Sequence, residues 1–290
     1  MPKAVQQTGG VKRAASKPVP KLGGAWDRIS DMEFDPDEGV SVCLYGNSGT
    51  GKTTFWATFP DPILAVICSG IQKPGELRSV YTAENRRRIK TVTLENADEM
   101  FEIVRGQQQT NTFRTIVLDH ATGLQDLIIK EMLNLDETIL QRTWGTLTRG
   151  QWGDVSTKTK ELLRPFLNLG CHRIVVNQER VNEPSDESSE IVSANIGPAL
   201  TGGAAGGLTP ACDYVVQTFI RNKVISQTSQ INGKPQTITK RTKEVEYCLR
   251  CGPGSGYSTK FRMPIGESGR VPEVIIDPTY DKMISVIRGE

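Results

Sequence analysis

The sequence predicts an α/β fold in which a mostly parallel, twisted sheet carries helices on both faces. From Gly39 onward, short apolar runs typical of strands alternate with segments of helical periodicity, which indicates right-handed crossovers between parallel strands. A glycine-rich segment joins the first strand directly to the first helix. The last strand-like runs have no helix between them. We therefore expect an antiparallel extension at the C-terminal end of the sheet.

The size and charge of the chain limit the classes of protein it can be. Its 290 residues can form one large α/β domain or two small ones. The 35 basic and 33 acidic residues nearly balance, so the whole molecule is not an obvious polyanion binder. No apolar run approaches the ~18 residues of a membrane span, and the N-terminus has no apolar signal core. These features predict a soluble, intracellular protein that does not act at a membrane.

The N-terminal segment, residues 1–36, is predicted to be a disordered basic tail, and residues 37–290 to be the folded domain. The first 25 residues contain five basic side chains and no acidic one, among many Gly, Pro, Ser and Gln residues. Such a composition cannot bury a core. Two interpretations of this tail remain open: weak attraction to nucleic acid, or a solvated leader.

The cysteines favour a reduced protein with buried thiols. Four lie in apolar, strand-like runs, and the remaining pair forms an isolated CxxC. A zinc site would need two further ligands, and the chain has only the histidines His120 and His172. Structural cysteines are therefore favoured over zinc binding or redox activity. The six are Cys43, Cys68, Cys171, Cys212, Cys248 and Cys251.

The strands are predicted from apolar runs, each bounded by polar or turn-forming residues. In chain order they are expected at 40–45, 63–68, 115–119, 173–177, 214–220, 245–249 and around 259–263. The helices are predicted from apolar residues that recur on one face. They are expected at 53–59, from Asn96 onward, after residue 119, and at about 152–169.

Two of the helices have additional sequence support. Glu99 lies three residues after Asn96, which is the spacing of a capping box. In that helix we expect one face to bury Ala97, Met100, Phe101 and Val104. In the helix after residue 119, the aligned residues are Leu124, Leu127, Ile128 and Met132.

Gly46-Asn-Ser-Gly-Thr-Gly-Lys-Thr53 is a complete phosphate-binding loop, with a strand before it and a helix after it. Its glycines let backbone N–H groups converge on phosphate oxygens, and the following helix adds its positive end. We expect Lys52 to reach the β and γ phosphates of ATP and the Thr53 hydroxyl to coordinate Mg²⁺. The predicted ATP-binding residues are Gly46, Asn47, Ser48, Gly49, Thr50, Gly51, Lys52, Thr53 and Thr54.

Asp119 is the candidate for the second Mg²⁺ ligand. It ends an apolar strand about 65 residues after the loop, where a carboxylate can hold the ion directly or through water. The alternative is an Asp that only forms the turn at the strand end. His120 is expected to be a packing or polar neighbour rather than a catalytic residue.

The groups that would promote hydrolysis are harder to assign. The second strand ends in Cys68-Ser-Gly70 without a carboxylate, so Glu76 is the leading catalytic candidate, the alternative being a solvent-facing loop residue. Gln178 follows an apolar strand at the carboxyl edge of the sheet, where ligands bind in open α/β folds. A neutral amide there can sense the γ-phosphate, although Gln178 could also be an ordinary surface residue.

These elements, in this order, resemble a RecA-type core, and more closely the phage-type RecA-like nucleotide-binding proteins. That group includes the short single-strand annealing ATPases of phage recombination systems, which would act in the host cytoplasm. The resemblance covers residues 41–281 and implies a RecA-like ATPase domain over 37–290. It rests on the loop 46–54, Pro74-Gly-Glu-Leu-Arg78, Ile116 to Asp119, Trp152 before a long helix, Val175 to Gln178, and Thr259-Lys-Phe-Arg262.

The resemblance also implies an assembly and a second set of catalytic residues. In RecA-like rings and filaments, a Lys-x-Arg pair on a late strand reaches the ATP of the neighbouring subunit. Lys260 and Arg262 match that pattern, which implies a homo-oligomer, ring or filament, with ATP at the subunit interfaces. Cations placed there would neutralise charge that develops on the γ-phosphoryl group. Alternatively, they are two surface cations on one face of a strand.

Two segments are candidates for contact with single-stranded DNA. In RecA-like proteins the loop at the position of residues 181–210 faces the DNA, and here it is long and glycine-rich at 201–207 but acidic at its start. In the segment 142–152, arginines alternate with Trp144 and Trp152, which are suited to base stacking. Alternatively, both tryptophans are core anchors.

The leading functional hypothesis is an ATP-dependent protein that binds single-stranded DNA in recombination, annealing or repair. Hydrolysis is expected, but it would be slow if Glu76 does not supply the missing carboxylate. The second hypothesis is a motor or loader ATPase that acts through a replication or recombination protein partner. A small-molecule kinase is the third. It would need an arginine-rich lid, whereas the only arginine cluster, 84–88, precedes a strand.

Overall fold

The structure is a computed structural model that describes residues 39–68, 74–133, 147–181, 196–231, 234–252, 256–262 and 271–290. All of these residues belong to one compact unit, Pro36–Glu290. The predicted basic tail, residues 1–36, lies outside the described residues. None of the helices in the described ranges is long and apolar enough to cross a membrane.

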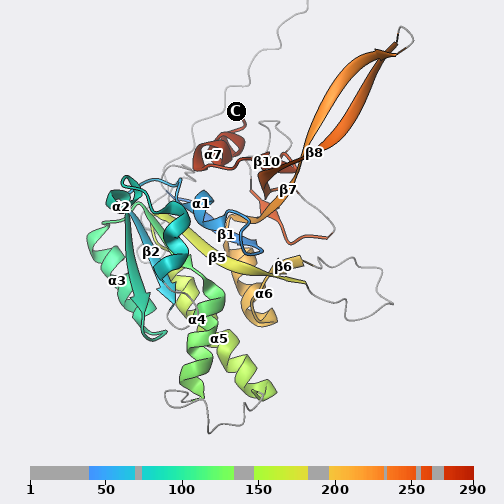
Figure 1. The fold of residues 1–290 in the computed structure, drawn as a ribbon. Helices are drawn as coiled ribbons and strands as arrows, with labels where there is room; N and C mark the ends of the chain where they lie inside the picture. The colour runs from blue at the N-terminus through green and yellow to red at the C-terminus, as the bar shows by residue number, and fades with distance from the viewer. Residues whose placement is uncertain are drawn as a thin grey trace, which may run out of the picture. The chain divides into compact units, whose positions relative to one another are not determined.

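Ten strands within the described residues form one sheet (Figure 1). They are β1 (Ser41–Gly46), β2 (Ile63–Cys68), β3 (Ile89–Leu94), β4 (Thr115–Asp119), β5 (His172–Val181), β6 (Ile196–Pro198), β7 (Tyr214–Ile231), β8 (Lys234–Arg250), β9 (Lys260–Phe261) and β10 (Val274–Ile276). The main order is β10-β8-β7-β1-β5-β4-β2-β3, with β6 paired to β5 and β9 paired to β7.

The pairing confirms a mostly parallel sheet with an antiparallel C-terminal extension. The strands from β7 through β1, β5, β4 and β2 to β3 are all parallel to one another. The later pairs β7–β8, β8–β10 and β7–β9 are antiparallel. Parallel neighbours need a crossover connection, whereas only two residues of the sequence separate β7 from its antiparallel partner β8. The fold is therefore α/β, with a mostly parallel sheet and an antiparallel C-terminal extension, as predicted.

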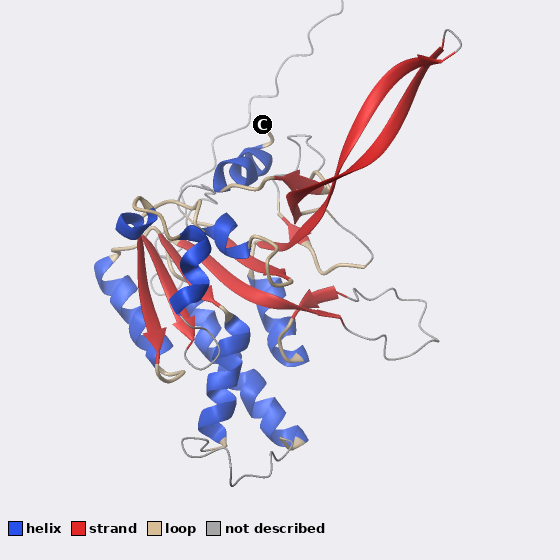
Figure 2. Ribbon diagram, viewed as in Figure 1, coloured by secondary structure: helices blue, strands red, loops and turns tan. Residues whose placement is uncertain are grey.

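Helices cover both faces of this sheet (Figure 2). They are α1 (Lys52–Trp56), the 3₁₀ helix η2 (Pro74–Val80), α2 (Asn85–Arg88), α3 (Glu99–Thr110), α4 (Ala121–Met132), α5 (Arg149–Leu167), α6 (Gly202–Ala211) and α7 (Tyr280–Arg288). Apolar residues of α3, α4, α5 and α6 pack on one face, and those of α1 and α7 pack on the other. Because both faces are covered, every residue of β1 and β2 is buried, which explains their uninterrupted apolar runs.

The helix boundaries differ from the predicted ones by a few residues. Only one of the two hydrogen bonds of the predicted capping box is present: the backbone N–H of Glu99 donates to Oδ1 of Asn96. The helix begins at Glu99 rather than near Asn96, because residues 97–98 form a turn. Met100 and Val104 are buried as expected, whereas Phe101 is 40% exposed and does not belong to the core. Helix α5 begins earlier than predicted because Thr148 forms a capping box with Gln151.

The strands predicted at 214–220 and 245–249 are much too short. β7 and β8 remain paired from Gln217 with Arg250 out to Ile231 with Lys234, with one irregularity between Asn222 and Val224. Beyond Ile220 the sequence contains mostly polar and charged residues, so an apolar run no longer marks the strand. Backbone hydrogen bonds continue the hairpin past the end of the parallel sheet.

The glycine-rich segment 201–207, expected to be a flexible loop, instead forms most of helix α6. The glycines allow α6 to lie close against α5. A Cβ atom on Gly203 would lie 3.1 Å from the Ser156 side chain, and one on Gly207 would lie 2.9 Å from the Lys160 side chain. Here the missing side chains serve close helix packing rather than flexibility. The acidic part of the predicted DNA loop, residues 182–195, lies outside the described residues.

Candidate nucleotide-binding site

The phosphate loop connects the end of β1 to the start of α1, as predicted. Gly46, Gly49 and Gly51 have φ angles of 157°, 79° and 89°, and the last two are left-handed values that favour glycine. A Cβ atom on Gly46 would lie 2.3 Å from the carbonyl oxygen of Thr218. The loop therefore needs its glycines both for its backbone conformation and for its close approach to β7.

Lys52 directs its ammonium group into this loop. Its Nζ atom donates hydrogen bonds to the carbonyl oxygens of Gly46 at 2.7 Å and Asn47 at 2.8 Å. Burial lowers the pKa of Lys52, while the nearby carboxylates of Asp119 and Glu179 act to raise it. The ammonium is thus held inside the loop, where phosphate oxygens can replace the two carbonyl groups as its partners.

Thr50 fastens the loop to the neighbouring strand. Its Oγ1 atom donates to the carbonyl oxygen of Asn47 at 2.7 Å and lies 2.8 Å from Oγ1 of Thr218 on β7. The loop is therefore preorganised, which lowers the entropic cost of binding a ligand.

Asp119 lies at the end of β4, where the sequence predicts the second metal ligand. It is 5% exposed, and its Oδ2 atom accepts a hydrogen bond from Nε1 of Trp56 in α1 at 3.2 Å. The Thr53 hydroxyl and the Asp119 carboxylate are hard oxygen donors of the kind that Mg²⁺ prefers.

His120 caps α4, because its Nδ1 atom accepts from the backbone N–H of Gly123 at 2.8 Å. It is therefore a polar neighbour, as expected.

Glu179 is a site residue that the sequence analysis missed. Its Oε1 atom accepts a hydrogen bond from Nδ2 of Asn47 in the loop at 3.1 Å, and its Oε2 atom accepts from Nε2 of Gln217 at 2.7 Å. Gln217 in turn accepts from Nε of Arg250 at 3.1 Å, and Arg250 pairs with Glu273 at 3.2 Å. Side-chain contacts therefore link the phosphate loop to β5, β7 and β8. The only sequence signal was the position of Glu179, directly after Gln178.

Gln178 lies beside the start of the loop, since it is the parallel partner of Gly46 in the sheet. Its side chain is half-buried, and its role as a γ-phosphate sensor stays a prediction. Glu76 belongs to η2, but its side chain lies outside the described part of the chain. The catalytic role of Glu76 therefore also stays a prediction.

The sequence matches the model of an AAA domain family, AAA_24, over residues 38–263. The chain belongs to this AAA domain family. The match includes the phosphate loop, Asp119 and Gln178, so the phosphate-binding motif of this chain is part of an AAA domain.

Comparisons with individual proteins give only a distant likeness. No curated protein matches the sequence. Among solved structures, a KaiC-like protein from the hyperthermophilic archaeon Pyrococcus horikoshii OT3 is similar, with a TM-score of 0.41 and 16% sequence identity. The similarity covers 83% of this chain and 90% of that one.

Glu179 places a negative charge beside the phosphate loop of this AAA domain, where it should oppose the binding of phosphate groups. Glu179→Gln is expected to strengthen ATP binding about fivefold, because it removes a negative charge next to the phosphate loop that is worth about 1 kcal/mol after solvent screening. Titration calorimetry would measure the dissociation constant. Glu273→Gln, at the far end of the same side-chain network, serves as the matched control. Unchanged or weaker binding in Glu179→Gln would show that the charge does not oppose the nucleotide.

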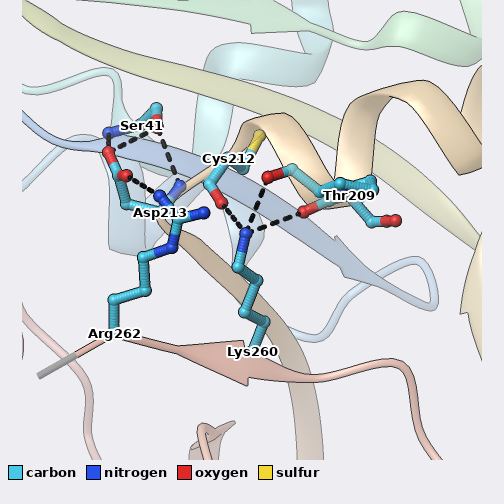
Figure 3. Close-up of polar contacts among 7 residues, drawn as sticks. Ser41, Thr209, Cys212, Asp213, Lys260 and Arg262 are labelled. Carbon is cyan, nitrogen blue, oxygen red and sulfur yellow. Dashed lines mark hydrogen bonds and ion pairs between the residues drawn. The ribbon is translucent and has the colours of Figure 1, made fainter.

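Lys260 and Arg262 point toward Cys212 and Asp213, which follow α6, and Ser41 lies beside Asp213 (Figure 3). Nζ of Lys260 donates to the carbonyl oxygens of Pro210 at 2.8 Å and Cys212 at 2.7 Å, at the C-terminal end of α6. Arg262 pairs with Asp213 at 2.9 Å, and Asp213 accepts from the Ser41 hydroxyl at 2.7 Å.

Ser41 is the first residue of β1, and the loop begins at the end of that strand. Along a parallel strand of this length the two ends are roughly 16 Å apart. The two cations therefore do not belong to the nucleotide site of their own chain. Their action on the ATP of a neighbouring subunit stays a prediction.

The remaining candidate groups have structural explanations. All six cysteines are free and buried, and burial raises the pKa of Cys68 and Cys251 to about 12, which keeps these thiols protonated and unreactive. Within the described ranges, no group of three or more His, Cys, Asp or Glu side chains is placed to hold a metal ion. Arg88 pairs with Asp61 at 3.3 Å and donates to the carbonyl oxygen of Phe59 at 3.1 Å. Arg88 thus fastens α2 to the segment after α1.

A second feature of this AAA domain is an open pocket of about 670 Å³ between α5 and α6. Trp152, Lys160 and Arg180 line it, together with Gly202 and Gly203 at the start of α6. Trp152 is 43% exposed, so its interpretation as a core anchor is wrong. Trp144 lies outside the described residues.

Proposed function

We propose that the chain is an ATP-hydrolysing, RecA-like protein that binds single-stranded DNA in recombination, annealing or repair and acts as a homo-oligomer. The observation that carries the DNA-binding part is the pocket between α5 and α6. It joins Trp152 to the first turn of α6, two places that the sequence analysis had treated as separate candidate DNA contacts.

The nucleotide part of the proposal is supported by the loop and by Asp119. Lys52 binds the β and γ phosphates in place of the carbonyl groups of Gly46 and Asn47. The Thr53 hydroxyl and the Asp119 carboxylate would hold Mg²⁺, which neutralises phosphate charge when bound. Gln178, the strand partner of Gly46, contacts the γ-phosphate from β5, and Glu76 orients the attacking water.

The pocket contains the groups that a single strand requires. An exposed indole such as that of Trp152 is a stacking surface for a base, and stacking tolerates any sequence. Lys160 and Arg180 are exposed cations beside it, and cations bind the phosphate backbone. Gly202 and Gly203 begin α6 without side chains of their own, Gly202 has open space where a Cβ atom would lie, and Thr201 makes no side-chain cap there.

The test is binding of a fluorescently labelled single-stranded oligonucleotide, with and without ATP, over a range of salt concentrations. We expect wild-type affinity to fall with salt and to rise with ATP. Trp152→Ala should weaken binding by roughly tenfold, whereas Trp152→Phe, which keeps an aromatic ring, should weaken it much less. Phe101→Ala is the matched control, since Phe101 is a similarly exposed aromatic residue on α3.

Equal affinity in wild type and Trp152→Ala would contradict the pocket as the DNA site. If wild type with ATP binds no single strand at any salt concentration, the DNA-binding proposal is wrong. That result would favour the alternative, a motor or loader ATPase that acts through a protein partner.

A further inference from the structure

The β7–β8 hairpin continues past the phosphate loop. β7 runs parallel to β1, with Gln217 paired to Tyr45. β1 ends one residue later, at Gly46, where the loop begins, whereas β7 continues to Ile231 (Figure 1). The first residues of the hairpin beyond Gln217 therefore lie alongside the loop.

Tyr247 of this hairpin contacts the loop. A Cβ atom on Gly51 would lie 3.1 Å from Cδ1 of Tyr247 and 3.7 Å from its Cε1. The tyrosine ring thus lies over the glycine that precedes Lys52. It is nevertheless 46% exposed, so one part of the ring is against the loop and the rest is open.

Strand alternation places this ring on the α1 side of the sheet. Leu249, two residues further along β8, packs in the same apolar cluster as Phe55 and Trp56 of α1. Ile220, the cross-strand partner of Tyr247, is also exposed, at 48%. The two side chains form an apolar surface next to the phosphate loop.

The surface formed by Tyr247 and Ile220 has no charged strand neighbour on its own face, and the backbone of β8 at Tyr247 is held by a hydrogen bond. The next pair on the same face is Asn222 with Val245, while the ion pair between Arg221 and Glu246 lies on the opposite face. The carbonyl oxygen of Tyr247 accepts a hydrogen bond from the backbone N–H of Asp277 at 2.8 Å, which holds this part of β8 in place.

We propose that Tyr247, with Ile220, is the base-binding platform of the nucleotide site. A nucleotide whose phosphates occupy the loop carries its base one ribose away, so the base must rest on a surface that borders the loop. A purine ring gains most from a flat, apolar, aromatic neighbour, which the open part of the Tyr247 ring provides. This inference rests on the proposed function, because it takes ATP as the ligand of the loop.

The platform would bind only the base, whereas the loop would bind only the phosphates. The test therefore compares a ligand that has a base with one that has none. Binding of ATP and of inorganic tripolyphosphate, in the same magnesium buffer, is measured by titration calorimetry. We expect Tyr247→Ala to weaken ATP about tenfold, as for other base–aromatic stacks, and to leave tripolyphosphate affinity unchanged. Tyr247→Phe should bind ATP as wild type does.

Val224→Ala is the control, since Val224 lies further along the same hairpin and is similarly exposed; it should leave both affinities unchanged. Tyr247→Ala binding ATP as tightly as wild type, or losing ATP and tripolyphosphate equally, would overturn the platform alone. A wild-type protein that binds tripolyphosphate as tightly as ATP would do the same. A wild-type protein that binds neither ligand would overturn the proposed function and the platform with it.

Discussion

Lys52→Ala is expected to abolish ATP binding. The Lys52 ammonium lies inside the phosphate loop, 2.7 Å and 2.8 Å from two carbonyl oxygens that phosphate oxygens would replace. Removing one partner of a buried charge pair costs about 3–5 kcal/mol, which corresponds to a loss of affinity of about 10²-fold or more. Titration calorimetry measures this loss directly.

Lys282 is a matched control, because its removal also deletes an ammonium group that donates to two backbone carbonyl oxygens. Lys282 also donates two hydrogen bonds to carbonyl oxygens, those of Ile276 and Asp277, each at 2.8 Å, but it lies in α7, outside the loop. Lys282→Ala should keep wild-type ATP affinity, and thermal unfolding should show both variants folded. Normal ATP affinity in Lys52→Ala would contradict the assignment of the phosphate site.

Arg262→Ala is expected to reduce ATP turnover of the assembled protein by about 10³-fold or more while ATP affinity stays nearly unchanged. A cation that reaches the γ-phosphoryl group from a neighbouring subunit has an effect of this size in related systems. Arg262 lies at the far end of β1 from its own phosphate loop, and its side chain is 57% exposed although it pairs with Asp213. A role of Arg262 at ATP therefore requires the nucleotide site of another copy.

Mixing two inactive variants tests this role. Lys52→Ala subunits keep Arg262 but lack a working nucleotide site, and Arg262→Ala subunits keep the site but lack the cation. Their mixture should recover part of the wild-type turnover, because some interfaces then combine both intact halves. Asp213→Asn controls for loss of the ion pair alone. Isolated subunits that hydrolyse ATP as fast as assemblies would contradict the role of Arg262 in the neighbouring site.

The parts of the fold predicted best from the sequence are those with a local physical signal. The central strands are covered on both faces, so β1, β2 and β4 appear as unbroken apolar runs with nearly correct boundaries. The phosphate loop needs glycine at defined positions, and its motif therefore gives its conformation as well as its chemistry. Asp119 follows from the same logic, as a carboxylate at the end of a buried strand.

The parts that the sequence did not predict depend on contacts between distant segments. Glu179 is recognisable as a site residue only once β5 is extended past Asn177 and brought to Asn47. Tyr247 lies within the strand predicted at 245–249, but it is far along the chain from the loop, so its contact with Gly51 could not be predicted. Helix α6 was predicted to be a loop because glycine usually favours flexibility, whereas here it permits close packing on α5.

The most direct test of the account is ATP hydrolysis measured with and without single-stranded DNA over a range of protein concentrations. The proposed function predicts a rate that DNA stimulates and that rises more than linearly with protein, because each active site needs a second subunit. A rate that is indifferent to DNA and strictly proportional to protein would contradict an oligomeric, DNA-coupled ATPase.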